Sequence, residues 1–549
     1  MPCPPHQIAC GPCGWELGTP RLFQFPLPDP FSACLPACAT ASPPPPPWVS
    51  PAAGLAGRTG RKPEEEEEDE PQQWQQQQHD IGCCAASAAC ATQGLRLLTS
   101  VALVILLLWA TLPYDNALRL SARFNTHRLV TFLRGPLRNE RWLYEPPAFP
   151  LDWSRDVAII LKTGYGTQER ALAWIEALAT GISPENVIIV GDFGVELATR
   201  DGARSGLKVH DVIARFVDER LAVHEDARYP RLEKYMNLKA AISAGEDELA
   251  RDYSSSFGWE LDAMKFMPSL ELAYRAMPDK KWFILVDDDT YLIYPSLNFI
   301  LGHFDPSIAH YLGNAVGDYR QRFAHGGSSI ALSRATMQAL FAPSNHHTIA
   351  KARRASLTET WGDRLLSDAL LRLGVSVDED ASRFFNGEQP WASRLRADRF
   401  CAPVATFHRL SRTEMATVGS TFRDAVDPVL WVDLWEVYAL RGRQQDRAAD
   451  ARPSVSRGSS SGVSEEMPGR VGWDHVGVLD EHTQTFVDVK TALVCSGHCV
   501  SSHKCMAWAW DEGKGLCHLS PWVTVGKEAA GMVSGPNVDR VRALADECR

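Results

Sequence analysis

No cysteine lies between Cys90 and Cys401, although the 549-residue chain contains 14 cysteines. Eight of them precede residue 91, and five crowd the end of the chain after residue 494. The absence excludes a central core held by disulfides and indicates a large core that is stable without them. The dense tail predicts a small disulfide-linked module, which requires an oxidising compartment.

The sequence also lacks a basic stripe, an internal repeat and an Asn-x-Ser/Thr sequon. Seven of the negative charges behind its net charge of -11 lie in one run, Glu64–Glu70, so the remainder carries about -4. The missing basic stripe excludes a general nucleic-acid-binding protein. A length of 549 residues allows two or three domains with at least one large hydrophobic core.

One long segment, Leu97–Leu112, carries no charge and is strongly apolar. It predicts a single transmembrane anchor over residues 95–114, and a buried core helix is the alternative. The arginines that follow the segment favour a cytosolic C-terminal part, whereas the cysteine-dense tail favours a luminal one. We adopt the luminal orientation, that of a single-pass type II protein of the Golgi or endoplasmic reticulum membrane.

Composition divides the chain into six segments. Residues 1–94 contain proline, acidic and glutamine runs and predict a disordered tail. The expected segments after that tail are the anchor (95–114), a stem (115–150), an α/β domain (151–441), a Ser-, Arg- and Gly-rich linker (442–469) and the cysteine-rich module (470–549).

Three short apolar runs inside the α/β domain predict buried strands. They are Val157–Leu161, Val187–Val190 and Trp282–Val286, and a helical pattern over Ala171–Leu178 separates the first two. This alternation predicts βαβ units and a mostly parallel sheet. Ligands of such sheets bind beyond the carboxyl ends of the strands, where polar residues follow each run here.

The third run ends directly in Asp287, Asp288 and Asp289. Clustered carboxylates repel one another and raise each other's pKa unless a cation lies between them. A Mg²⁺ or Mn²⁺ ion shared with substrate phosphates resolves this repulsion, because both metals prefer oxygen ligands. The alternatives are a solvated acidic turn and a helix N-cap.

Three further motifs carry candidate chemistry. FAHGGSSIALSR contains Gly326 and Gly327, which allow a close approach of backbone to a ligand but also suit a plain turn. WGDRLLSDALL places Asp363 at a helix start, as a general base or as an N-terminal cap. CAPVATFH ends in His408, which is a metal ligand only if the carboxylates lie nearby.

The order of these pieces resembles the Fringe-like β-1,3-glycosyltransferases, glycosyltransferase family 31, and in particular its fungal branch. The matching segments are AIILKTG, GWELDAMKFMPSLELAY, WFILVDDDTYL, YLGN, FAHGGSSIALSR, WGDRLLSDALL, FFNGEQP and CAPVATFHRLSRTEM. The resemblance implies a GT-A-type nucleotide-sugar-binding domain over residues 151–441, of α/β class around a mixed sheet. It also implies a UDP-sugar donor and Mn²⁺ or Mg²⁺ as cofactor.

The resemblance further implies roles for individual residues. Asp287, Asp289 and His408 would hold the metal, and Asp363 would deprotonate the acceptor hydroxyl. Residues implied to contact the donor are Lys162, Thr163, Arg170, Lys265, Asp287, Asp288, Gly326 and Gly327. The implied reaction transfers a hexose or N-acetylhexosamine to a glycan or glycoprotein with inversion, which gives a β-linkage, β-1,3 in this family.

The spacing of Cys495, Cys499, Cys505 and Cys517, with MAWAW before the last, looks like a PAN/apple module, a small disulfide-rich α+β fold. A zinc site is the alternative, but paired C-x2-C hooks are missing. Cys401 and Cys548 either pair with each other or stay free. Two other functions remain open: an inactive transferase fold that binds through this module, and a hydrolase that uses paired carboxylates.

Overall fold

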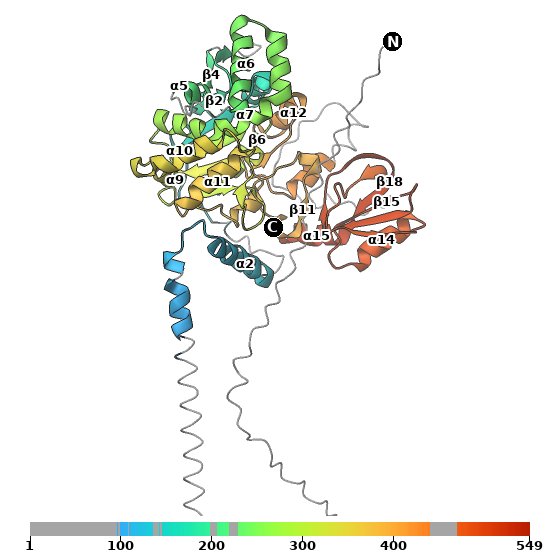
Figure 1. Ribbon diagram of the computed structural model, residues 1–549. Coiled ribbons are helices and arrows are strands. Elements are labelled where there is room, and N and C mark those ends of the chain that lie inside the picture. Colours follow the sequence, from blue (N-terminus) through green and yellow to red (C-terminus); the bar gives the residue numbers. More distant parts are fainter. Residues whose placement is uncertain are drawn as a thin grey trace, which may run out of the picture. The chain divides into compact units, whose positions relative to one another are not determined.

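The computed structural model describes residues 96, 99–107, 109–134, 142, 145–197, 206–218, 229–439 and 469–548. Its largest sheet in this part of the chain has seven strands in the order β3-β4-β2-β1-β5-β10-β7, of which β4 and β2 are labelled in Figure 1. In that order they are Val195–Leu197, Leu207–Asp211, Val187–Gly191, Val157–Lys162, Trp282–Asp287, Ile330–Ser333 and Tyr311–Gly313. The three predicted strands are therefore confirmed as β1, β2 and β5.

The sheet is mixed, as the family resemblance implied, so the mostly parallel sheet predicted from the βαβ pattern is wrong. Strands β4, β2, β1 and β5 run parallel, whereas β10 pairs antiparallel with both β5 and β7, and β3 pairs antiparallel with β4. Residues Ile330–Ser333 of the FAHGGSSIALSR motif form β10. Every residue of β1 is buried, as expected of a central strand covered on both faces.

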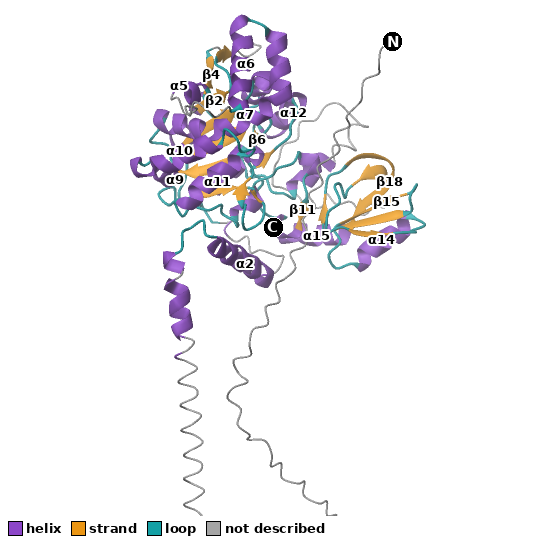
Figure 2. Ribbon diagram, in the orientation of Figure 1, coloured by secondary structure: helices purple, strands orange, loops and turns teal. Residues whose placement is uncertain are grey.

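Helices cover both faces of this sheet (Figure 2). On one face, alternate strand residues such as Ile160 and Leu285 pack against α7, α9, α10 and α11. On the other, Ile159 and Ile284 pack in a core that includes α4, α8 and α12. These helices are α4 (Gln168–Glu176), α7 (Asp247–Ala276), α8 (Tyr294–Leu301), α9 (Arg334–Leu340), α10 (His346–Ala355), α11 (Gly362–Arg372) and α12 (Arg412–Phe422).

Further helices and short strands lie outside this sheet. The further helices are α2 (Ala117–Arg134), α3 (Trp153–Asp156), α5 (Ala214–Asp218) and α6 (Pro230–Ala244), with a π-helix at Trp435–Ala439. Two-residue strands are β6 (Tyr291–Leu292), β8 (Ala315–Val316), β9 (Phe323–Ala324), β11 (Leu395–Arg396) and β12 (Thr406–Phe407). The 3-10 helices are Tyr165–Thr167, Pro184–Asn186, Gly326–Ser328, Pro343–Asn345, Ala381–Phe384, Pro390–Ala392 and Ala397–Arg399.

The predicted transmembrane anchor over residues 95–114 is wrong. Among the described residues, the helices are all too short or too polar to cross a membrane. Described helical residues in this segment are 96, 99–107 and 109–111, and the helix ends ahead of Pro113. The proline ring disfavours helical backbone at the residue before it, which limits the length of the apolar helix.

Residues 469–548, called the C-terminal domain below, form a five-stranded sheet in the order β13-β18-β15-β16-β14. Its elements are β13 (Arg470–Asp474), β14 (Gln484–Phe486), α14 (Ala492–Ser501), β15 (Ala507–Asp511), β16 (Leu516–Ser520), β17 (Trp522–Val523), β18 (Lys527–Pro536) and α15 (Val538–Glu547). Disulfides join Cys495 to Cys517 and Cys499 to Cys505, and a third joins Cys401 to Cys548.

The segment boundaries stay predictions. The disordered tail over residues 1–94 and nearly all of the linker over 442–469 lie outside the described residues. The assignment of the C-terminal domain to the PAN/apple fold likewise stays a prediction.

Candidate active site

Strand pairing brings the three aspartates and His408 to one edge of the large sheet. β1 and β5 run parallel with Lys162 opposite Asp287, so both strands end at the same level. Asp289 precedes β6, and His408 follows β12. Because β6 and β12 pair antiparallel, with Tyr291 opposite Phe407, the imidazole lies beside the carboxylates.

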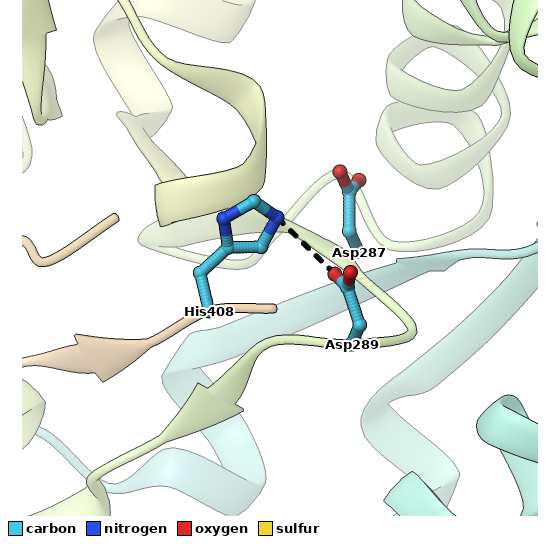
Figure 3. Close-up of side chains that lie close together, drawn as sticks. All are labelled: Asp287, Asp289 and His408. Carbon is cyan, nitrogen blue, oxygen red and sulfur yellow. Dashed lines mark ion pairs between the residues drawn. The ribbon is translucent and has the colours of Figure 1, made fainter. Parts of the chain in front are cut away.

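Asp287, Asp289 and His408 form a group able to hold a metal ion (Figure 3). One potential ligand atom from each lies within 4.8 Å of the others, and His408 Nε2 is 3.3 Å from Asp289 Oδ1. The ring Nδ1 lies 3.2 Å from the carbonyl oxygen of Gly387. A carbonyl can only accept, so Nδ1 carries the proton and Nε2 faces the carboxylates, as in oriented metal-binding histidines.

The charges of this group suit a cation. Burial alone would raise the pKa of Asp289, but the hydrogen bond and attraction to His408, with Arg170, lower it overall. Burial alone would lower the pKa of His408, but Asp289 raises it overall. His408 and Asp289 therefore stabilise each other's charged forms. Two carboxylate oxygens and one imidazole nitrogen are donor atoms that a divalent metal ion can use.

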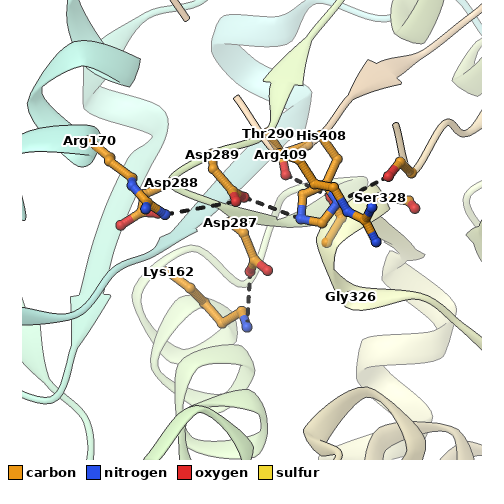
Figure 4. Close-up of polar contacts among 12 residues, drawn as sticks. Lys162, Arg170, Asp287, Asp288, Asp289, Thr290, Gly326, Ser328, His408 and Arg409 are labelled. Atoms are coloured by element: carbon orange, nitrogen blue, oxygen red, sulfur yellow. Dashed lines mark hydrogen bonds and ion pairs between the residues drawn. The ribbon is translucent and has the colours of Figure 1, made fainter. Parts of the chain in front are cut away.

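Lys162 is fully enclosed next to this group (Figure 4). Its ammonium lies 2.9 Å from Asp287 Oδ1, 2.8 Å from Asp262 Oδ2 and 3.9 Å from the centre of the Phe266 ring. Burial lowers the pKa of Lys162, but the two carboxylates outweigh it and raise the pKa overall. The lysine is therefore a permanent cation that orients Asp287.

Asp288 is bound by the segment that follows β1 and is not among the residues of the metal group. Its Oδ2 accepts hydrogen bonds from the hydroxyls of Thr163 and Thr167, at 2.7 and 2.6 Å. Burial raises the pKa of Asp288 to about 7, despite these hydrogen bonds. Asp288 thus fixes the start of the segment after β1 and is not part of the metal group.

The two glycines lie between the metal group and Asp363. The N–H of Gly326 donates to Asp363 Oδ2 at 2.9 Å, and Asp363 Oδ1 accepts from the N–H of Arg364 at 2.8 Å. A Cβ on Gly327 would come within 2.3 Å of the His408 ring, so only glycine fits there. Burial raises the pKa of Asp363 to about 6. A carboxyl with this pKa at a helix start can act as a base near neutral pH.

This arrangement agrees with what comparison with protein families finds. Residues 259–438 match the Fringe-like family. The match covers about a third of the chain and supports a glycosyltransferase of the Fringe-like family. Comparison with curated proteins gives no significant match.

The Fringe-like match contains eight of the eleven predicted site residues: Lys265, Asp287, Asp288, Asp289, Gly326, Gly327, Asp363 and His408. Lys162, Thr163 and Arg170 precede it, yet the structure brings all three to the same site. Arg170 is half exposed, with its Nη1 3.9 Å from Asp289 Oδ2. Its guanidinium therefore lies at the exposed side of the metal group.

Lys265 lies one layer deeper than the metal group. It is buried, with its ammonium 3.0 Å from Asp192 Oδ2 and donating to the carbonyl of Thr163 at 2.8 Å. Asp192 also accepts from the N–H of Tyr165 at 2.9 Å. Lys265 therefore holds the ends of β1 and β2 together.

Sequence reasoning missed three residues that support the site: Asp262, Thr167 and Asp192. Asp262 precedes Lys265 by one turn of α7, and Thr167 follows Thr163 by four residues. Asp262 could have been predicted from its helical spacing to Lys265, which was already a candidate. Asp192 directly follows strand β2, where ligands of such sheets bind, and that position was its signal.

Proposed function

We propose that this protein transfers a hexose or N-acetylhexosamine from a UDP-sugar to a hydroxyl of a glycan or glycoprotein. The reaction depends on Mn²⁺ or Mg²⁺ and inverts the anomeric centre, so an α-linked donor gives a β-linked product, β-1,3 by family resemblance. The oxygen of the acceptor forms the new glycosidic bond, UDP departs with the electrons of the old one, and the acceptor proton passes to a base.

One observation carries this proposal: an Asp-Asp-His metal group and a buried carboxyl lie on either side of the same glycine turn. Gly327 packs against the ring of His408, and Gly326 donates to Asp363. A single displacement needs a charged site for the leaving group and one base, and this turn separates the two.

Three groups of residues have separate roles in this reaction. Asp287, Asp289 and His408 would hold the metal, which when bound neutralises charge on the departing diphosphate. Arg170 offers a further positive charge toward the diphosphate. Asp363 accepts the acceptor proton, because its raised pKa of about 6 still leaves it ionised at neutral pH.

We also propose that the protein works in an oxidising compartment such as the lumen of the endoplasmic reticulum or Golgi. Three disulfides in the described residues support this, because the cytosol keeps thiols reduced.

A thermal-unfolding panel tests the function. The full chain is heated with UDP-glucose, UDP-galactose and UDP-N-acetylglucosamine, each with and without Mn²⁺. We expect one UDP-sugar to raise the melting temperature only when Mn²⁺ is present. A well-folded sample that no UDP-sugar stabilises would favour a transferase fold without turnover that binds through its C-terminal domain.

A further inference from the structure

His408 is held by a segment that also belongs to the interface with the C-terminal domain. This segment, residues 386–401, is called the bridge segment. Its first residues contact the histidine twice: the carbonyl of Gly387 faces the ring Nδ1 at 3.2 Å, and the carbonyl of Glu388 accepts the backbone N–H of His408 at 3.2 Å. The position and rotation of the imidazole therefore depend on the bridge segment.

The start of the bridge segment is rigidly folded. The side chain of Asn386 donates to the hydroxyl of Ser393 at 2.6 Å and accepts from the N–H of Glu388 at 3.2 Å. The Ser393 hydroxyl donates onward to the carbonyl of Gln389 at 2.7 Å. Asn386 and Ser393 are both buried, so a shift at one end of this turn is transmitted to Gly387.

The other end of the bridge segment is anchored to the C-terminal domain. Strand β11 pairs antiparallel with β17, and the N–H of Gly526 donates to the carbonyl of Trp391 at 3.1 Å. Arg394 lies 2.6 Å from Asp480 and stacks 4.0 Å from the Trp522 ring. The final residue, Cys401, forms the disulfide to Cys548 near the end of the chain.

We infer that the C-terminal domain positions the metal ligand His408 through the bridge segment. This inference rests on the proposed metal site, and it gives a role in that site to residues outside the Fringe-like match. Pairing with β17 of the C-terminal domain holds β11 in place, and β11 holds the adjoining Asn386–Ser393 turn. That turn sets the position and rotation of the His408 imidazole. Loss of a group that orients a metal-binding histidine typically weakens metal binding by about 10–100-fold.

Two variants of the full chain test this inference by different routes. The first, Cys401→Ser with Cys548→Ser, removes the covalent anchor, and the second, Arg394→Ala, removes the ion pair and the stacking. Mn²⁺ affinity is measured by electron paramagnetic resonance of the free ion. Hydrogen–deuterium exchange of residues 386–410 is measured without metal. We expect about tenfold weaker Mn²⁺ binding and faster exchange across residues 386–410 in both variants.

Matched controls separate positioning from general loss of stability. Arg396→Ala removes an exposed ion pair with Asp398 at the end of β11, and Cys499→Ser with Cys505→Ser removes a disulfide inside the C-terminal domain. Both should leave Mn²⁺ binding unchanged. Unchanged affinity and unchanged exchange in both test variants would overturn the inference. If the wild type binds no Mn²⁺, the proposed function fails, and the exchange rates alone decide whether the domain positions His408.

Discussion

Asp363 is the side chain whose protonation controls the proposed transfer. Burial raises its pKa to about 6, while two backbone N–H groups and the nearby charge of Lys162 act in the opposite direction. The carboxyl is therefore ionised at pH 7 and above and protonated well below pH 6. Only the ionised form can take a proton from the acceptor hydroxyl.

The pH dependence of the rate follows from this pKa. We expect kcat/KM to fall about tenfold for each pH unit below about pH 6 and to be level above about pH 7, when Mn²⁺ is saturating. Asp368→Asn, which changes another part-buried carboxyl on the same helix, should keep this profile. A rate that stays constant from pH 5 to pH 7 would rule out Asp363 as the base.

Residue identity predicted much of this site, but not all of it. The run of aspartates after an apolar strand predicted the metal group, and family resemblance predicted His408 and Asp363. No local pattern places His408 next to Asp289, because a two-residue ladder between β6 and β12 does so across more than a hundred residues. The sequence also could not predict the hydrogen bonds of Asp288 with Thr163 and Thr167, because both hydroxyls belong to the segment that follows β1.

At the scale of elements, Lys162 joins β1 to both β5 and α7. Its ammonium lies between Asp287 at the end of β5 and Asp262 on α7, with the side chain almost fully buried. Removing one member of a buried ion pair leaves the other charge without a partner. The loss in folding stability then exceeds the stability that the intact pair contributes.

We expect Lys162→Met to destabilise the fold by about 3 kcal/mol, because Asp287 and Asp262 then repel each other without a cation between them. Saturating Mn²⁺ should restore part of this loss, because the ion would neutralise Asp287. Urea unfolding with and without Mn²⁺ measures both effects. Lys514→Met, at an exposed pair with Asp511, should change stability by less than about 1 kcal/mol. An equal loss in both variants would remove the special role of Lys162.

Element prediction succeeded where patterns are long and failed where context decides. The apolar runs of β1, β2 and β5 are unbroken, and the helix that begins at Gly362 has clear periodicity. Strand β10 is too short to be distinguished from a helix start by sequence alone. The apolar composition of the segment before Pro113 predicted a transmembrane helix. The described helix there is not long and apolar enough to cross a membrane.

At the scale of the whole molecule, the Fringe-like and C-terminal domains share one hydrophobic cluster. Leu395, Phe400 and Trp435 pack with Val523 and Leu544 in this cluster. A shared core couples the stability of two domains, because separating them exposes apolar surface on both sides.

Coupled domains should unfold together. We expect a single calorimetric transition for the wild type and two transitions for Val523→Asp, because the buried carboxylate would separate the domains. Val500→Asp, at a mostly exposed position of the C-terminal domain, should keep one transition. A single transition that persists in Val523→Asp at an unchanged temperature would show that this cluster does not couple the domains.

The central claim is that Asp287, Asp289 and His408 hold a metal that binds the donor nucleotide. Calorimetric titration of UDP into the full chain, with and without Mn²⁺, tests it in the wild type, in Asp289→Asn and in Asp279→Asn. Asp279 is an almost fully exposed carboxylate, paired with Arg334 away from the site, and serves as the control. We expect Mn²⁺-dependent UDP binding in the wild type and the control, with at least about tenfold weaker binding in Asp289→Asn. Equal UDP affinity in all three proteins, or UDP affinity that does not change when Mn²⁺ is added, would show that these residues do not form the metal site.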